Sequence, residues 1–325
     1  MTAPSHRPAT KLRARRRVMT AVLGAGAALA LAACTGVTYA QTPVPTPPTT
    51  TASSPKPATP PTCTNATQTF DPLPSIPASS AITDRKTRDI IERGHLIVGV
   101  SADSYLLGAR NPFTGAIEGF DIDMAKAMAQ SLLGDGNKVQ LRVITAADRL
   151  PLLEDGSVDM VARNMTMTCD RWEKINFSAE YYHSGQKVLV TRSSKAQTLE
   201  DLDGKRVCAP VDTTTLAKLA SVKGPIPVTA SNHTGCLVLF QQGKADAITG
   251  DDTVLAGLAA QDPYAKVTKA PAITDEPYGL GFNKKDVYLT KYASTLLDEL
   301  KSDGTWKKIY DKWFAGPLGP TRPPS

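Results

Sequence analysis

Side chains that could do covalent or metal chemistry are few in this sequence. The 325 residues include five cysteines and four histidines, and these have no zinc-site spacing. The sequence also has no Walker-type phosphate loop, no Gly-x-Ser-x-Gly nucleophile elbow and no dinucleotide-binding glycine fingerprint. We therefore expect no metal, no cofactor and no enzymatic activity.

One cysteine, Cys34, follows a stretch with the pattern of an export signal. Basic residues at 13–17 precede an apolar, uncharged run at 18–33. This run is short for a membrane span, which needs about 20 apolar residues. It ends in Leu31-Ala32-Ala33-Cys34, which resembles a bacterial lipobox, where the cysteine becomes the lipidated first residue of the mature protein. An ordinary secretory signal is the alternative. We predict a lipid-anchored protein on the extracytoplasmic face of the cell membrane.

The charge distribution argues against a nucleic-acid partner. The formal net charge is +6, but residues 1–33 contribute six basic residues and no acidic one. The remaining 292 residues carry 31 basic and 31 acidic side chains, so their net charge is zero. A neutral body lacks the basic footprint that binds phosphate backbones.

The elements that must position the charged residues begin near Arg85. Residues 41–62 precede them and contain eight prolines, a composition typical of an extended spacer. Strands are predicted at 95–100, 139–144, 159–162, 206–209 and 245–249, and helices at 121–133, 146–154, 214–220, 236–242 and 253–260. Two further amphipathic helices are expected within 292–314. This alternation favours α/β layers with mainly parallel sheets, and the length suits two lobes.

Ten short motifs occur in order along residues 85–315. The first five are Gly94-His95-Leu96-Ile97-Val98-Gly99-Val100, Gly119-Phe120-Asp121-Ile122-Asp123, Arg149-Leu150-Pro151-Leu152-Leu153, Gly156-Ser157-Val158-Asp159 and Met165-Thr166-Met167-Thr168-Cys169-Asp170-Arg171. The others are Phe177-Ser178-Ala179-Glu180-Tyr181-Tyr182, Asp201-Leu202-Asp203-Gly204-Lys205, Ala245-Asp246-Ala247, Glu276-Pro277-Tyr278-Gly279 and Asp303-Gly304-Thr305-Trp306. Together they resemble the polar amino-acid substrate-binding proteins of ABC importers, in particular the glutamate and glutamine branch from high-GC Gram-positive bacteria.

The resemblance implies a two-lobed α/β fold of the type II periplasmic-binding-protein kind, with two hinge strands joining the lobes. It implies a signal peptide at 1–33, a lipidated N-terminus and linker at 34–80, lobe 1 at 81–187 and 276–325, and lobe 2 at 188–275. The expected function is to capture glutamate or aspartate by lobe closure and deliver it to ABC permease subunits. We expect a monomer, attached to the membrane only through its lipid. Glutamine and asparagine remain alternative ligands.

An amino acid is a zwitterion, so its site needs donors for the carboxylate and an acceptor for the ammonium. The resemblance implies that Arg171 grips the α-carboxylate, that Thr166 adds its amide and hydroxyl, and that the carbonyl of Asn164 faces the ammonium. Asp251 would pair with the ammonium, and Asp252 beside it is expected to be a helix N-cap. Two threonines that precede a helix would supply amides for the carboxylate or act only as an N-cap: Thr213 and Thr214.

Choice of the ligand side chain is expected to depend on three further residues. Arg149 would meet a distal carboxylate, as in acidic amino-acid binders, or instead pair with Asp148 or Glu154. His233 has the spacing of a ligand-facing histidine in those proteins, and would favour glutamate if protonated. Ser101 stands where the first strand opens into the cleft.

Four cysteines remain after Cys34, an even number in an exported chain, which favours two disulfides among three connectivities. The lobe assignment implied by the resemblance decides between these connectivities, because a disulfide between the lobes would oppose closure. We therefore expect Cys63 to pair with Cys169 and Cys208 with Cys236.

Two other functions share this fold. One is a sensor module that signals through a membrane partner, and the other is a dehydratase acting on cyclic acids. Turnover of a bound ligand would identify the enzyme, whereas uptake in a deletion strain would separate importer from sensor.

Overall fold

The computed structural model describes residues 63–325, which belong to one compact unit. The predicted export signal, Cys34 and the proline-rich segment lie outside the described residues. The longer helices are α2 (Arg85–Arg93), α3 (Phe120–Leu133), α6 (Thr214–Ser221), α7 (His233–Gln241), α8 (Asp252–Gln261), α9 (Val287–Ser302) and α10 (Thr305–Trp313). The shorter ones are η2 (Ser79–Ala81), α4 (Arg149–Glu154), α5 (Cys169–Trp172), η3 (Glu200–Leu202) and α11 (Ala315–Leu318).

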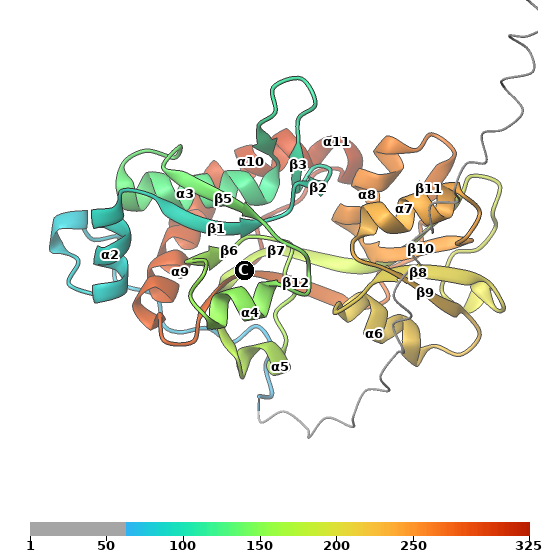
Figure 1. Ribbon diagram of the computed structural model, residues 1–325, viewed down its shortest axis with the longest axis horizontal. Coiled ribbons are helices and arrows are strands. Elements are labelled where there is room, and N and C mark those ends of the chain that lie inside the picture. Colours follow the sequence, from blue (N-terminus) through green and yellow to red (C-terminus); the bar gives the residue numbers. More distant parts are fainter. Residues whose placement is uncertain (1–62) are drawn as a thin grey trace, which may run out of the picture. The chain divides into compact units, whose positions relative to one another are not determined.

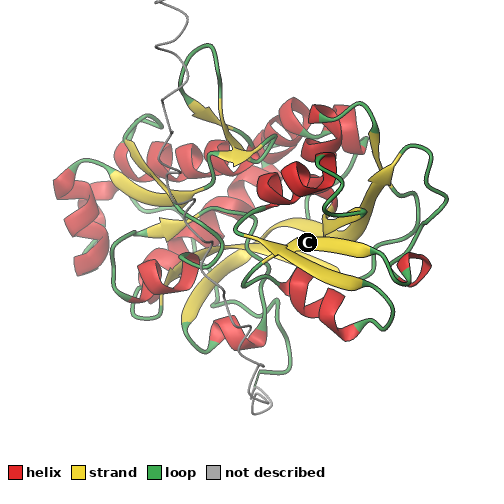
Figure 2. Cartoon of the chain, turned by 45° about the vertical axis from the view of Figure 1, so that its right-hand side comes forward, coloured by secondary structure: helices red, strands yellow, loops and turns green. Residues whose placement is uncertain are grey.

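The strands form two sheet halves that share a long strand. They are β1 (Leu96–Val100), β5 (Val139–Val143), β6 (Met160–Val161), β7 (Ile175–Thr191), β8 (Arg206–Pro210), β9 (Ile226–Ala230), β10 (Ala247–Asp251), β11 (Ala265–Val267) and β12 (Asp275–Asn283). Their order is β5-β1-β6-β12-β7-β10-β8-β9, and β11 pairs with β7. We call the half built on β5-β1-β6-β12 lobe 1 and the half built on β10-β8-β9 lobe 2. Figure 1 shows both halves, and Figure 2 shows helices flanking the strands. The predicted two-lobed α/β fold is confirmed.

Two antiparallel strands run from one lobe into the other. β7 pairs with β12 from Ile175 to Gly185, and from Gln186 onward its partner is β10. The 17-residue strand therefore belongs to both halves of the sheet, and the hinge lies where its partner changes.

Local sequence signals account for the starts and ends of the helices beside the strands. α3 ends at Gly134 in the left-handed conformation, with φ of 74°. The side chain of Asn232 caps α7 by accepting a hydrogen bond from the amide of Gly235 at 2.7 Å, so this helix begins three residues before the predicted start. The expected N-cap at Asp252 is wrong, because α8 begins at Asp252 and Asp251 occupies the cap position.

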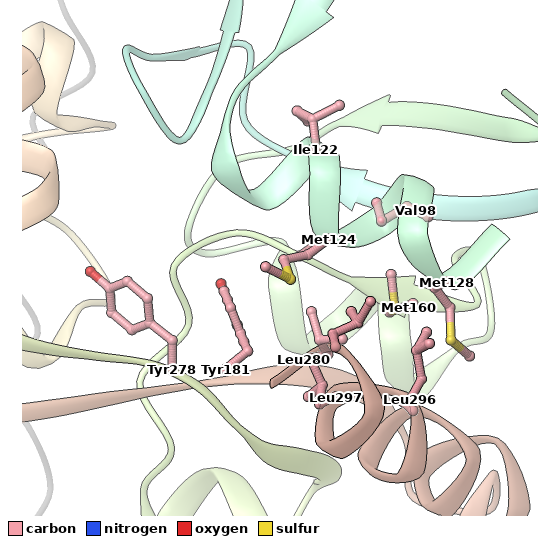
Figure 3. Packing of buried hydrophobic residues seen from close by; sticks show 14 of the residues in the cluster. Val98, Ile122, Met124, Met128, Met160, Tyr181, Tyr278, Leu280, Leu296 and Leu297 are labelled. Atoms are coloured by element: carbon pink, nitrogen blue, oxygen red, sulfur yellow. The ribbon is translucent and has the colours of Figure 1, made fainter. Parts of the chain in front are cut away.

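Each lobe has its own apolar core. In lobe 1, α3 and α9 pack against the sheet through fully or almost fully buried side chains (Figure 3), among them Val98, Met124, Met128, Met160, Leu280 and Leu297. In lobe 2, the corresponding core contains Leu189, Cys208, Cys236, Ile248 and Leu255. Separate cores allow the lobes to move as two bodies about the hinge.

A three-stranded sheet absent from the sequence-based expectations lies at the lobe boundary. It consists of β2 (Asp103–Ser104), β3 (Gly108–Arg110) and β4 (Ile117–Glu118). The carbonyl of Asp103 accepts a hydrogen bond from the hydroxyl of Thr234 in α7 at 3.0 Å. At Gly257 in α8, an added Cβ would lie 2.4 Å from the carbonyl oxygen of Tyr105. Lobe 1 thus contacts two helices of lobe 2 here.

Both expected disulfides are present. Cys63 is bonded to Cys169, with 5.1 Å between their Cα atoms, and Cys208 to Cys236, with 5.5 Å. The first ties the start of the described chain to lobe 1, and the second links β8 to α7 inside lobe 2. Neither bond joins the two lobes.

Candidate functional site

The carboxyl ends of the parallel strands meet between the lobes and define a cleft. β1, β5 and β6 are parallel in lobe 1, and β8, β9 and β10 are parallel in lobe 2. Ligands in α/β proteins bind outside such carboxyl ends. The residues lining the cleft lie at the ends of these strands or beyond them: Ser104, Ala146, Arg149, Arg163, Asn164, Thr166, Arg171, Pro210, Thr213, Thr214, Thr215, Asn232, His233 and Asp251.

The cleft is narrow. Its cavity measures about 20 Å³, which is on the order of the space for one water molecule. A ligand as large as an amino acid can therefore enter only if the lobes separate.

Three arginines of lobe 1 line this cleft. Arg149 is 3% exposed and Arg163 6%, and burial lowers the pKa of Arg149, Arg163 and Arg171 below the ordinary arginine value. None of them forms an ion pair with a carboxylate of residues 63–325. This part of the cleft is suited to bind anions.

Backbone carbonyls hold these guanidinium groups in place. Arg149 donates from Nε to the carbonyl of Ala146 at 2.9 Å, and Arg171 donates from Nη1 to the carbonyl of Thr166 at 2.6 Å. Arg163 donates from Nε to the carbonyl of Ile144 at 3.0 Å. The alternative interpretation of Arg149, pairing with Asp148 or Glu154, is wrong. Sequence reasoning missed Arg163, which lies outside the motifs that carry the resemblance.

On the opposite side of the cleft stands a buried carboxylate, Asp251, at the end of β10. Its Oδ2 accepts a hydrogen bond from the hydroxyl of Tyr278 at 2.5 Å, whereas Oδ1 is buried without a hydrogen-bond partner among the described residues. Burial, followed by the negative charge of Glu276, raises the pKa of Asp251 to about 7. An unpartnered buried carboxylate oxygen is suited to accept from an ammonium group.

Asn164 adds a second unpartnered acceptor and is held in an unusual backbone conformation. Its φ is 34°, and its amide donates to Oδ2 of Asp121 at 2.9 Å. Burial raises the pKa of Asp121 to about 6. The carbonyl of Asn164 faces Nη1 of Arg149 at 3.4 Å, while its side-chain Oδ1 is buried without a partner in the described chain. The side chain, rather than the expected carbonyl, is therefore the freer acceptor.

The three expected threonines have two different roles: Thr213 is a helix cap, whereas Thr166 and Thr214 are hydrogen-bonded to Glu276. Thr213 caps α6, because its hydroxyl accepts from the amide of Leu216 at 3.1 Å and donates to the carbonyl of Pro210 at 2.7 Å. The hydroxyls of Thr166 and Thr214 both donate to Oε2 of Glu276, at 2.6 and 2.8 Å. A ligand carboxylate would thus meet amides here, such as those at the start of α6. The sequence signal for Glu276 was only its place in a motif.

Two expected side-chain selectors behave differently from the prediction. His233 lines the cleft, but burial lowers its pKa to about 4, so the ring is neutral near pH 6 and adds no positive charge there. Ser101 is not among the cleft-lining residues. Its hydroxyl instead donates to Oδ1 of Asp103 at 2.7 Å and shapes the loop that brings Ser104 to the cleft.

The described residues contain no group of three or more His, Cys, Asp or Glu side chains that could hold a metal ion. Within residues 63–325, no helix has both the length and the apolar character needed to cross a bilayer.

Solved structures share this architecture. A mutant of an arginine-binding protein from T. maritima matches with a TM-score of 0.66 and 29% identity, covering 71% of this chain and 99% of that one. An ancestral arginine-binding protein bound to glutamine matches with a TM-score of 0.63 and 32% identity, covering 68% and 98%.

Sequence comparison leads to the same group of proteins. The chain is 35% identical to the ABC transporter glutamine-binding protein GlnH of Bacillus subtilis, over 69% of this chain and 83% of that protein. It is 30% identical to the glutamate-binding protein GluB of Corynebacterium efficiens, over 67% and 78%. Residues 96–316 match the model of the bacterial extracellular solute-binding proteins, family 3. The chain therefore belongs to the bacterial extracellular solute-binding proteins of family 3.

Proposed function

We propose that this protein captures acidic amino acids, glutamate or aspartate, outside the cytoplasm and delivers them to an ABC importer. The relatives whose names give a ligand include both glutamine-binding and glutamate-binding proteins. The names alone therefore do not decide whether the ligand has an acidic or an amide side chain. The cleft supports an acidic ligand.

The observation that carries this choice is the unpaired charge of Arg149. Arg149 is 3% exposed, lines the cleft and has no ion-pair partner among residues 63–325. Arg171 and Asp251 would bind the α-carboxylate and α-ammonium of any amino acid. These contacts therefore contribute equally to the affinities of glutamate and glutamine. A distal carboxylate would pair with Arg149, whereas an amide presents one oxygen and an NH₂ group that cannot accept.

Titration calorimetry of wild-type protein and Arg149→Gln with glutamate and glutamine tests this proposal. Wild type should bind glutamate more tightly, and Arg149→Gln should remove most of that preference while largely keeping glutamine binding. Arg142→Gln is the matched control, because Arg142 is exposed on β5 and does not line the cleft. Equal wild-type affinity for both ligands, or equal weakening of both by Arg149→Gln, would contradict the acidic assignment.

We further propose that the protein is a monomeric binding protein without catalytic activity and that Cys34 anchors it to the membrane by a lipid. Lobe 1 would comprise residues 81–187 and 276–325, lobe 2 residues 188–275, and residues 34–80 the linker. The export signal and lipobox support the anchor. Cys34→Ala should release the protein from the membrane fraction, whereas a wild-type protein already found in the soluble fraction would exclude lipidation.

A further inference from the structure

Glu276 is a buried carboxylate that neither the motif nor the charge pattern marks as functional. It lies near the start of β12, at the hinge, and is 3% exposed. Its Oε1 accepts from the hydroxyl of Thr274 at 2.7 Å. Its Oε2 accepts from the hydroxyls of Thr166 at 2.6 Å and Thr214 at 2.8 Å. Three hydroxyl groups therefore converge on one carboxylate.

The two hydroxyls on Oε2 come from different lobes. Thr166 follows β6 in lobe 1 and forms a β-bridge with Tyr278 of β12. Thr214 is the first residue of α6, which follows β8 in lobe 2. Both threonines line the cleft, and their Oγ1 atoms are 3.5 Å apart. A single oxygen atom thus connects the two walls of the cleft.

The bonds use the only proton that each hydroxyl has to donate. They are bonds to a carboxylate in a buried site, where hydrogen bonds to charged groups are stronger than neutral ones. If the lobes separated, Thr214 would move away with α6 while Thr166 stayed beside β12. Opening the cleft would then leave the carboxylate short of one donor.

We propose that Glu276 is a positioning residue that ties Thr166 of lobe 1 to Thr214 of lobe 2 and favours the closed arrangement of the cleft. The inference rests on the proposed function only in linking closure to ligand capture, because all three groups of the tie belong to the protein. A tie that is kept when the lobes close around a ligand lowers the free-energy cost of that closure and thereby raises ligand affinity, since apparent affinity scales with the population able to hold the ligand.

Hydrogen-exchange mass spectrometry of the full chain without added amino acid tests the tie directly. The amide of Leu216 is bonded to the hydroxyl of Thr213, whereas the amides of Thr214 and Thr215 have no partner inside the helix, so their protection depends on how far the closed cleft excludes water. Peptides covering 212–219 should exchange faster in Glu276→Ala than in wild type. Peptides of α9 should exchange equally in both, which shows that lobe 1 remains folded.

Two matched variants separate the tie from general stabilisation. Glu276→Gln keeps an oxygen that can accept from both threonines, so it should restore slow exchange at 212–219. Thr274→Val removes the third bond to the same carboxylate but leaves the link between the lobes. Peptides covering 212–219 should therefore also exchange slowly in this variant.

Calorimetry on the same samples measures amino-acid affinity and so tests the proposed function separately. Glu276→Ala should bind glutamate on the order of tenfold more weakly than wild type, because closure is no longer favoured in advance. Wild-type exchange at 212–219 in Glu276→Ala would overturn the tie, as would equal acceleration in Glu276→Ala and Thr274→Val. Failure of wild type to bind any amino acid would instead overturn the proposed function and leave the exchange comparison interpretable.

Discussion

At the scale of single residues, the cleft is defined by a cation without a counter-ion and by acceptors without donors among the described residues. Arg149 has no carboxylate partner in the described structure, and Oδ1 of Asp251 and Oδ1 of Asn164 have no donor. Buried polar groups normally find partners within the fold. A cation without a counter-ion and two acceptors without donors around one cavity therefore create affinity for a molecule that carries both an anion and an ammonium group.

The raised pKa of Asp251 predicts how binding depends on pH. With a pKa of about 7, the carboxyl group is increasingly protonated as pH falls below 7 and can no longer pair with an ammonium. Glutamate affinity should therefore fall by up to about tenfold per pH unit below pH 7. The neutral His233 does not counteract this decrease, because its own pKa is about 4.

Calorimetry between pH 8 and pH 5 checks this prediction, with Asp251→Asn as the comparison. The variant should bind about a hundredfold or more weakly at pH 8, because an uncompensated buried charge costs about 3–5 kcal/mol. Its pH dependence should be much smaller. A remaining decrease near pH 6 would be assigned to Asp121, whose pKa is about 6. An unchanged pH profile in Asp251→Asn would remove Asp251 from the ammonium site.

At the scale of elements, the contact between the β2–β3 turn and α8 limits what can stand at position 257. An alanine Cβ there would lie 2.4 Å from the carbonyl oxygen of Tyr105, closer than atoms can approach without a shift. Alanine favours a helix over glycine by about 1 kcal/mol, so Gly257→Ala should not weaken α8. Overpacking costs about 1–3 kcal/mol. This cost would destabilise the closed arrangement, in which Tyr105 lies against Gly257.

Gly257→Ala should therefore lower ligand affinity about 5- to 150-fold without lowering the melting temperature of lobe 2. Gly316→Ala in α11 is the control, because a Cβ at that glycine would meet no atom within 4 Å. Calorimetry and thermal unfolding of both variants make the comparison. Wild-type affinity in Gly257→Ala would show that this contact does not limit closure.

The sequence predicts those elements whose own residues carry a recognisable pattern. It does not predict elements and contacts that depend on residues far away in the sequence. β1 is predicted from a short apolar run that ends at Ser101, α3 from apolar residues at helical spacing that stop at Gly134, and α6 from the threonines at its start. β2, β3 and β4 are two or three residues long and have too few residues to show a period. The same limit applies to Glu276, because its partners Thr166 and Thr214 lie 110 and 62 residues away.

Side-chain roles followed a similar division. The pairing of Cys208 with Cys236 was predicted because assignment to a lobe leaves few choices. Ser101 was misplaced because the loop after β1 turns its hydroxyl toward Asp103, a detail that a strand end does not encode.

At the scale of the whole molecule, both disulfides stabilise one lobe each and leave the hinge free. The Cys208–Cys236 bond closes a segment of 28 residues between β8 and α7. A loop of this size is worth about 3.6 kcal/mol through restriction of the unfolded chain. The combined substitution Cys208→Ser and Cys236→Ser should therefore lower the free energy of unfolding by about that amount.

The same variant should retain wild-type affinity for its ligand at temperatures where it is folded. Chemical unfolding and calorimetry measure the two quantities independently. A loss of affinity larger than the loss of folded protein would mean that this bond also helps to shape the cleft.

The position of β12 in the sheet has a consequence for the order in which the two lobes can become complete. β12 lies between β6 and β7, yet it is made more than 80 residues after the end of β7. The strands β7 to β10 of lobe 2 are complete once the chain has reached Asp251. Until residue 283 is available, β6 and β7 therefore lack the neighbour that separates them, and their edges stay unpaired while β7 to β10 are already present.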